Sequence, residues 1–532
     1  MYRKTLILLL SFICTLVSVA RDNEITSPRQ KLVMAERLIE TFYADSVDSD
    51  KMVEQAIIAM LKQLDPHSTY TDADETKELT TALEGNFSGI GISFNMQNDS
   101  LYVISTISGG PSEKAGILPG DRIIAADDSI ISGVGRKNSS VMSILRGEKG
   151  TKVNITVVRR SEPGTLSFVV VRDDIPVESV AAKYMVNDSI GYIRLSRFAE
   201  TSDKEVKDAV AAFRKKGMTS LILDLTDNSG GYMKSAIEIA GEFLPKNKII
   251  VTTKANKLGQ EAEYAAQKGG GATYMKLVVM VNQYSASASE IVSGALQDYD
   301  RAVVVGRRTF GKGLVQRPMP FPDGSMIRLT IARYYTPSGR LIQKPYKEGG
   351  EDEYNLDLYD RIKSGEYFSR DSVHFDESKK TKTLVKGRTI YGGGGIMPDI
   401  FVPVDTTVNP PVLRKLIATN AVAAYAQDYA DINRGRIMGE YPDEDLFISG
   451  FEITPEILSG LLKKAEVKDT TITREAFEID KNVIALYLKA LIGRQLYSPN
   501  VFYRQIMTLD PIYKKSVEIL SDGKYTEVLQ NQ

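Results

Sequence analysis

Four short runs of almost uninterrupted apolar residues constrain the fold of this chain more than any other feature of its sequence. The runs are SIGYIRL, SLILDL, KLVVMVN and AVVVG, all between residues 187 and 335. Strands that are apolar along most of their length are typical of a parallel sheet, because helices cover both of its faces. Segments with helical periodicity lie between the runs, over residues 203–216, 234–244 and 287–299. The sequence therefore predicts an α/β core.

The pattern changes on both sides of this core. With 532 residues the chain is too long for one ordinary hydrophobic core, so several domains are expected. Apolar residues at helical spacing occupy residues 30–43, 50–64 and 75–83, and helical spacing returns after residue 411. We predict five regions: a signal peptide (1–20), a helical N-terminal region (21–84), a small β-rich module (85–172), the α/β core (173–405) with an exposed polar insertion at 345–385, and a helical C-terminal region (406–532).

The N-terminus reads MYRKTLILLLSFICTLVSVA. Arg3 and Lys4 precede an apolar run that ends in small residues, which is typical of a secretory signal peptide. An uncleaved membrane anchor is the alternative. The only cysteine, Cys14, lies in this segment, so the mature chain would have no disulfide, thiolate nucleophile or cysteine-based metal site. A signal without later cysteines indicates an exported protein of a bacterial periplasm, which is membrane-associated if the signal is not cleaved.

The stretch VGRRTFGKGLVQ, residues 305–316, is close to a phosphate-binding loop. Such a loop needs a serine or threonine after its lysine and a helix directly behind it. Here Gly313 follows Lys312, and the next residues, LVQRPMPFPDG, contain three prolines. The sequence therefore argues against a nucleotide-dependent ATPase, and a formal net charge of −1 argues against bulk binding of nucleic acid. No cofactor or metal site is predicted.

The stretch YSASASEI, residues 284–291, follows the run KLVVMVN and opens a predicted helix. Two interpretations are open. Ser287 and Glu290 fit a capping box, which would satisfy backbone amides at the start of the helix. A strand-to-helix turn is also a place where a serine nucleophile is exposed with amides nearby.

A nucleophilic serine needs a base, and the chain has only two histidines. His67 lies in DPHSTY and His374 in the polar insertion, and no motif surrounds either one. A lysine serves as the base in Ser-Lys dyads if burial or a nearby positive charge keeps it neutral. The glycines on both sides of Lys312 would allow the close backbone packing that buries its amine. Lys312 is therefore the candidate base.

Residues 85–172 show a specific order of elements. Gly89-Ile90-Gly91-Ile92 opens a strand, GGPSEKAGILPGDRIIAADD contains a short helix and a strand, and LRGEKGTKV follows a second helix. This order closely resembles a PDZ domain. The resemblance implies that the backbone of Gly89, Ile90, Gly91 and Ile92 binds the C-terminus of a peptide, which adds as a strand to the sheet edge.

The core motifs carry a second resemblance. YSASASEI, LQDYDRAVVVGRRTFGKGLVQ and DGSMIRLTIARYYTPSGRLIQ, together with LILDLTDNSGG and YGGGGIMPD, closely resemble the C-terminal processing peptidases, also called tail-specific proteases. The resemblance runs from about residue 30 to 405 and includes the PDZ-like module. It implies a multidomain α/β protein: a ClpP/crotonase-like serine peptidase core with an inserted PDZ domain and helical N- and C-terminal regions.

By this resemblance the chain is a serine endopeptidase that forms an acyl-enzyme. Its substrates would be proteins or peptides with apolar C-termini, and neither a nucleotide nor a metal takes part. A homodimer and a regulatory or adaptor protein are left open as partners. The implied roles are nucleophile for Ser287, base for Lys312, orientation of that lysine for Gln316, and an oxyanion hole formed by the amide of Ala288 with that of Gly230 or Gly231.

Two further questions stay open. A non-catalytic secreted PDZ-type adaptor would only capture tails, but the presence of Ser287, Lys312 and Gln316 together argues against it. Arg146, in the LRG motif, is a candidate link between the PDZ-like module and the core. An ordinary surface arginine is equally consistent with the sequence.

Overall fold

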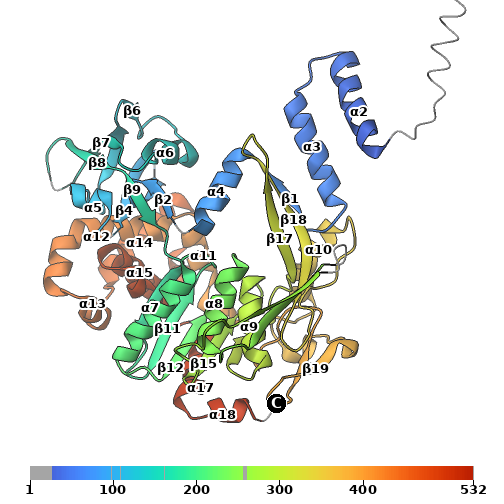
Figure 1. The fold of residues 1–532 in the computed structure, drawn as a ribbon. Coiled ribbons are helices and arrows are strands. Elements are labelled where there is room, and N and C mark those ends of the chain that lie inside the picture. The colour runs from blue at the N-terminus through green and yellow to red at the C-terminus, as the bar shows by residue number, and fades with distance from the viewer. Residues whose placement is uncertain are drawn as a thin grey trace, which may run out of the picture.

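The computed structural model describes residues 27–530 except 85, 98, 108, 161 and 256–259. The predicted signal peptide and Cys14 therefore lie outside the described residues. Within the described part, no helix combines the length and the apolar character needed to cross a membrane. The α/β core lies at the bottom of Figure 1, with the module of residues 85–172 and an N-terminal helical hairpin above it.

A six-stranded sheet forms the centre of the core. Its strand order is β10-β11-β12-β15-β16-β21, and all neighbours are parallel except β10 and β11, which are antiparallel. The strands are β10 (Val180–Met185), β11 (Ile190–Leu195), β12 (Ser220–Asp224), β15 (Lys276–Val281), β16 (Val303–Gly306) and β21 (Ile400–Phe401). The four apolar runs form β11, β12, β15 and β16, so the predicted α/β core with a parallel sheet is confirmed.

Helices cover both faces of this sheet. Because side chains alternate along a strand, Leu221 and Leu223 of β12 belong to one core and Ile222 to the other. The first face is covered by α7 (Ser202–Lys215), α8 (Met233–Phe243) and α9 (Ala288–Asp298). The second is covered by α17 (Pro511–Ser521) and α18 (Tyr525–Val528), at the end of the described chain. The last helices are thus part of the α/β core, although the sequence predicted that this core ends at residue 405.

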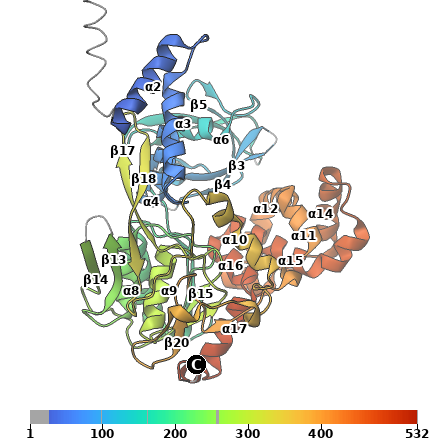
Figure 2. The same ribbon diagram turned by 90° about the vertical axis from the view of Figure 1, so that its right-hand side faces the viewer.

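A second sheet stands beside the first and is built from distant parts of the chain. Its order is β1-β18-β13-β14, and β17 forms a hairpin with β18. The strands are β1 (Thr69–Thr71), β13 (Ile249–Ala255), β14 (Gln260–Ala265), β17 (Leu314–Pro320) and β18 (Met326–Tyr335). The β17–β18 hairpin projects from the core toward the N-terminal helices (Figures 1 and 2).

The N-terminal region contains this one strand in addition to its helices, which are α2 (Pro28–Phe42), α3 (Ser49–Lys62) and α4 (Ala73–Glu84). Thr69 of β1 lies opposite Arg328, and Thr71 lies opposite Met326. The sequence did not predict β1, because three residues show no periodicity and the partner strand lies 255 residues away. The pairing attaches the helical region to the core.

The β-rich module that resembles a PDZ domain in sequence folds as a separate unit, called the PDZ domain below. Its sheet has the order β3-β4-β5-β7-β8 with β6 beside β5, and β2 pairs with β9. The elements are β2 (Asn86–Gly89), β3 (Ile92–Gln97), β4 (Ser100–Thr106), α5 (Pro111–Ala115), β5 (Arg122–Ala126), β6 (Ser129–Ile130), α6 (Asn138–Leu145), β7 (Lys152–Val158), β8 (Leu166–Val171) and β9 (Asp173–Pro176). Within the described residues β3 pairs with β4 alone, so its other backbone edge is free.

The polar insertion at 345–385 differs from the prediction, because several of its side chains are buried. It contains α10 (Glu351–Lys363), two short 3-10 helices, η1 (Arg370–Ser372) and η2 (Glu377–Lys379), and β19 (Lys380–Lys382), which pairs with β20 (Thr389–Tyr391). Tyr354, Arg361 and Glu366 are almost fully buried. Arg361 donates to the carbonyls of Thr309 and Phe310, at 2.8 and 3.1 Å. The polar composition of this insertion gave no indication that its side chains support the loop that carries Lys312.

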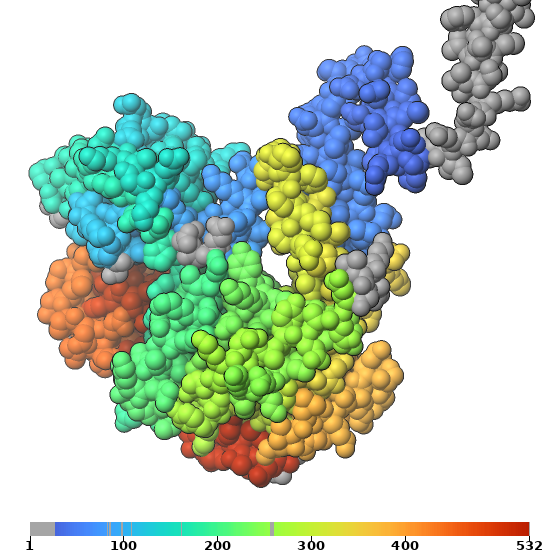
Figure 3. Space-filling model, in the orientation of Figure 1, coloured from blue at the N-terminus to red at the C-terminus, as the bar shows by residue number. Residues whose placement is uncertain are grey.

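The C-terminal helices form a unit with its own hydrophobic core. They are α11 (Pro411–Ala418), α12 (Ala421–Glu440), α13 (Glu444–Gly450), α14 (Pro455–Lys468), α15 (Arg474–Leu496) and α16 (Pro499–Ile506), after a short η3 (Thr406–Val408). The PDZ domain (cyan) lies on this unit (orange), and α4 (blue) lies between the PDZ domain and the β17–β18 hairpin (yellow; Figures 1 and 3). At the contact, Asp431 of α12 fills the space that a Cβ on Gly120 would need.

Candidate active site

Ser287 lies between β15 and α9, in a backbone conformation that is rare for a residue with a side chain. Its φ is +56°, in the left-handed region, and such a conformation costs about 1–3 kcal/mol. A hydrogen bond to the neighbouring strand end stabilises the turn, because the Ser285 hydroxyl donates to the Leu225 carbonyl at 2.8 Å. Ser287 thus occupies the strained strand-to-helix turn that exposes a nucleophile in other hydrolases.

A glycine loop packs directly against this turn. A Cβ on Gly230 would lie 2.9 Å from Ser287 Cβ and 3.2 Å from the Ala288 nitrogen, so only glycine fits. Asn228, a residue that the sequence did not single out, accepts the Gly230 N–H on Oδ1 at 2.9 Å. Among the described residues, the amides of Ala288 and Gly231 donate to no protein atom. Of the two candidate glycines, Gly231 is therefore the one with a free donor in this structure.

Lys312 is half-buried and points to Gln316. Its Nζ donates to Gln316 Oε1 at 2.9 Å, and Gln316 Nε2 donates to the carbonyl of His67. Burial and, to a lesser extent, the positive charge of Arg328 lower the pKa of the Lys312 amine to about 8, against the opposing effects of Asp65 and Glu290. At pH 7 about one tenth of the lysine would be neutral. The arrangement suits a general base.

Glu290 connects the serine turn to the lysine loop. Its buried carboxylate accepts four hydrogen bonds, and burial raises its pKa while these bonds oppose that change. Oε2 accepts the N–H of Ser287 at 2.8 Å and that of Lys312 at 2.9 Å. Oε1 accepts the N–H of Gly311 at 2.7 Å and the hydroxyl of Thr309 at 2.5 Å. The predicted cap of α9 therefore has a second function, which is to fix the distance between Ser287 and Lys312.

Tyr334, from β18, contacts both candidate catalytic residues. Its hydroxyl donates to the Lys312 carbonyl and lies close to the Ser287 side chain, and burial raises its pKa well above the usual value. No hydrogen bond among the described residues joins the Ser287 hydroxyl directly to the Lys312 amine. Tyr334 therefore packs against the turn of Ser287 and the loop of Lys312.

The two histidines lie in very different places. His67 is close to Lys312, and its Nε2 lies 2.8 Å from the hydroxyl of Tyr354 on α10. Burial and the Lys312 charge lower the pKa of His67 to about 3, so it stays neutral and is a weak base. His374 is exposed and pairs with the carbonyl of Ser372. The sequence signal for His67 was its place in DPHSTY, directly before β1.

The predicted peptide-binding loop of the PDZ domain presents its backbone. Gly89 ends β2, Gly91 has a φ of +74°, and Ile92 begins the edge strand β3. The side chain of Ile90 is buried in the domain core, so it does not line a surface pocket. The Arg146 guanidinium lies over the Phe87 ring, 4.7 Å from its centre, within the same domain. The structure thus places Arg146 in the PDZ domain without a recorded contact to the core.

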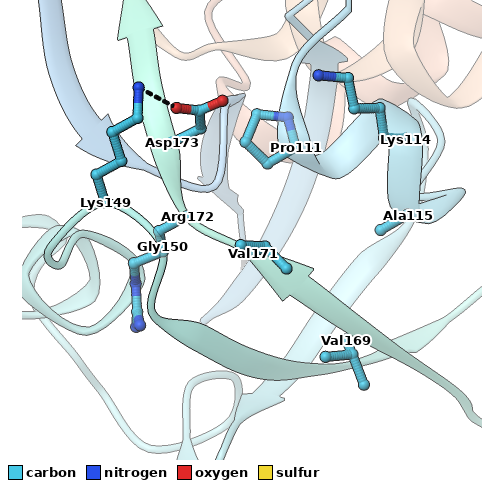
Figure 4. Close-up of a pocket in the computed structure, with 9 residues that line it drawn as sticks. All are labelled: Pro111, Lys114, Ala115, Lys149, Gly150, Val169, Val171, Arg172 and Asp173. Atoms are coloured by element: carbon cyan, nitrogen blue, oxygen red, sulfur yellow. Dashed lines mark ion pairs between the residues drawn. The ribbon is translucent and has the colours of Figure 1, made fainter.

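A surface hollow of about 470 Å³ lies elsewhere on the PDZ domain, between α5 and β8. Figure 4 shows Val169 and Val171 on its floor and the ion pair of Lys149 with Asp173, at 2.7 Å, on its rim. It contains no residue of the serine-lysine site. Among the described residues, no group of three or more His, Cys, Asp or Glu side chains is placed to hold a metal ion.

Comparison with known proteins identifies the class of protein first. Residues 189–350 match the model of Peptidase family S41, and residues 88–170 match that of the PDZ domain. The chain is therefore a PDZ-containing serine peptidase. Residues 17–76 match the Activating protease CtpB N-terminal domain, and residues 412–498 match a family of unknown function, DUF8443.

Relatives then identify the family. The chain is 36% identical over 459 residues to carboxy-terminal processing protease CtpA of Bacillus subtilis, covering 85% of this chain and 90% of that protein. It is 37% identical over 339 residues to a carboxy-terminal-processing protease of Bartonella bacilliformis, covering 63% and 77%. The chain belongs to the carboxy-terminal processing proteases. Among solved structures it is similar to a photosystem II D1 C-terminal processing protease, with 27% identity, a TM-score of 0.33, and coverage of 58% of this chain and 89% of that one.

We predict that Glu290→Gln lowers kcat by about tenfold or more, because misplacing catalytic groups by an ångström costs this much or more. A glutamine has one oxygen where the carboxylate has two acceptors, so its NH2 group would face an N–H or a hydroxyl. Steady-state kinetics on a peptide substrate measures the effect. Glu242→Gln is the matched control, since Glu242 also accepts a loop amide, that of Gly271 at 2.9 Å. Equal kcat for Glu290→Gln and wild type would contradict the prediction.

Proposed function

We propose that the chain is a tail-specific endopeptidase in which Ser287 is the nucleophile and Lys312 the general base. One observation carries the proposal: a single buried carboxylate oxygen of Glu290 binds the backbone N–H groups of both residues. A lysine with a pKa of about 8 on one side of this bridge, and a strained serine on the other, support a Ser-Lys dyad.

The reaction begins when the Ser287 hydroxyl comes within hydrogen-bond distance of the Lys312 amine. Neutral Lys312 accepts the hydroxyl proton as the serine oxygen attacks the peptide carbonyl. The amides of Ala288 and Gly231 stabilise the oxyanion, at about 3 kcal/mol per donor. The protonated lysine then gives its proton to the leaving amine, and water hydrolyses the acyl-enzyme with Lys312 again as base. Each step uses only side chains and amides of this chain.

The PDZ domain is proposed to hold the C-terminal tail of the substrate. A tail that lies along the free edge of β3 would exchange backbone hydrogen bonds with it, and its carboxylate would face the amides of the Gly89–Ile92 loop. The apolar character of the PDZ core next to this edge favours substrates with apolar C-terminal residues.

Ser287→Ala and Lys312→Ala should each abolish cleavage of a protein with an apolar C-terminal tail, while both variants still bind the tail. For the wild type, kcat/KM should rise with pH through a single ionisation near pH 8, because the base is active only when neutral. Mass spectrometry of the products and a pH profile measure these effects, with Ser293→Ala and Lys254→Ala as controls. Tail binding without cleavage by the wild type would favour the non-catalytic adaptor instead.

Amidation of the substrate's C-terminus tests the PDZ proposal separately. Removing the terminal charge should raise KM or lower tail binding by about tenfold, since charge-assisted hydrogen bonds contribute about 1.5–3 kcal/mol each. A pair of peptides that differ only in this group gives the comparison, by titration calorimetry on Ser287→Ala. Equal affinity for both peptides would show that the carboxylate is not recognised.

We further propose a homodimer formed through the N-terminal hairpin. No residue of the 15-residue helix α2 is buried, although it carries Leu32, Met34, Leu38 and Phe42, the last 77% exposed. An apolar surface of this kind on a soluble chain indicates a protein partner, and a second copy offers a matching apolar face. Leu38→Glu with Phe42→Glu should convert a dimer to a monomer in sedimentation analysis, whereas Ile479→Glu, at an exposed position of α15, should not. A wild-type monomer would contradict the proposal.

Export to a bacterial periplasm stays a prediction from the N-terminal sequence, and the first residue of the mature protein would decide between a cleaved signal and an anchor. A regulatory or adaptor protein as a further partner also stays a prediction.

A further inference from the structure

The six residues that join α3 to β1 form a compact turn around a buried carboxylate. Asp65, which is 8% exposed, accepts hydrogen bonds from the N–H groups of His67 and Ser68, at 2.9 and 3.0 Å. It also accepts from the hydroxyl of Ser68 at 2.6 Å and from that of Thr330, on β18, at 3.0 Å. The Asp65 side chain therefore fixes both the shape of the turn and its position on β18.

The turn presents the His67 carbonyl to Gln316. A carbonyl can only accept a hydrogen bond, so the NH2 group of Gln316 must face it, and Oε1 must face the other way. Gln316 Oε1 then accepts an N–H of Lys312 at 2.9 Å. When neutral Lys312 donates one N–H to Gln316, its lone pair must point away from Gln316. The orientation of the base thus depends on the position of one backbone carbonyl.

The charged groups that act on Lys312 come from three elements. The turn supplies Asp65 and the neutral His67, and β18 supplies Arg328, whose guanidinium is 3.2 Å from the hydroxyl of Thr69. Helix α9 supplies Glu290, while Tyr334 and Tyr354 are un-ionised because burial raises their pKa values. Lys344 acts on His67 rather than on Lys312 directly. Asp65 and Arg328 are therefore opposite charges that act on the same amine.

We propose that Asp65 is a positioning residue of the active site, which orients Lys312 through the His67 carbonyl and Gln316. The inference rests on the proposed Ser-Lys function. In this proposal a residue of the N-terminal region, which precedes the peptidase core in the sequence, supports the catalytic centre. Asp65 touches no substrate; it acts through the turn and through its charge.

Asp65→Asn keeps the size of the side chain and removes the charge and one acceptor. We expect kcat to fall by about tenfold to a hundredfold, because the lysine is misplaced. Losing the negative charge removes an effect that raises the Lys312 pKa, so the midpoint of the kcat/KM profile should move to lower pH. Arg328→Met removes an effect that lowers this pKa, so its midpoint should move to higher pH. A purely structural defect would not produce shifts of opposite sign.

The control is Asp72→Asn. Asp72 is an exposed carboxylate in the same region, and it caps α4 by accepting a hydrogen bond from the N–H of Glu75. It does not contact Gln316. Thermal unfolding and labelling of Ser287 by a fluorophosphonate establish that each variant is folded. A double-mutant cycle tests the pathway: in a Gln316→Ala background, Asp65→Asn should lower kcat by less than twofold further.

The outcomes separate this inference from the proposed function. Retained cleavage in Ser287→Ala or Lys312→Ala would refute the Ser-Lys function itself. If those variants are inactive but Asp65→Asn matches wild type in kcat and pH midpoint, the positioning role of Asp65 is refuted alone. Full additivity of Asp65→Asn with Gln316→Ala would likewise refute an action through Gln316.

Discussion

The active site depends on the buried carboxylate of Glu290. Taking a charged carboxylate out of water is costly unless it is fully hydrogen-bonded, and here four donors compensate for the burial. Because those donors come from α9 and from the loop after β16, the two segments cannot move apart without exposing an unsatisfied charge. The geometry between Ser287 and Lys312 is therefore fixed by a group that takes no part in the chemistry. The chain belongs to the carboxy-terminal processing proteases, and this bridge explains how a lysine and a serine 25 residues apart keep their register.

A similar balance sets the protonation of the lysine. Burial alone would make the amine a weak proton acceptor that is difficult to charge again, whereas full exposure would leave it protonated at neutral pH. The charges of Asp65 and Glu290 raise the pKa of Lys312 against the effect of burial, and the charge of Arg328 lowers it further. As a result, the amine can both accept and release a proton near neutral pH. The mechanism requires this, because Lys312 acts first as a base and then as an acid.

Much of the fold could be predicted from the sequence, and the reasons are local. Continuous apolar runs predicted β11, β12, β15 and β16, and the strand-to-helix position of Ser287 followed from them. The order of elements over residues 85–172, of which the Gly89–Ile92 motif is one part, predicted the PDZ domain. In contrast, Asp65, Tyr334 and Tyr354 were missed, because their functions arise from contacts between segments that lie far apart in the chain. A polar composition also concealed α10, whose Arg361 binds the carbonyls of the lysine loop.

The position of β1 has a consequence for how the molecule is made. Gln316 and His67 are 249 residues apart in sequence, and Thr330 and Asp65 are 265 apart. Closing loops of this length is entropically costly and comes late in folding. A chain that does not yet reach β18 lacks the strand that supports its own catalytic base. The long-range pairing therefore delays assembly of the active site until the chain has been made as far as β18.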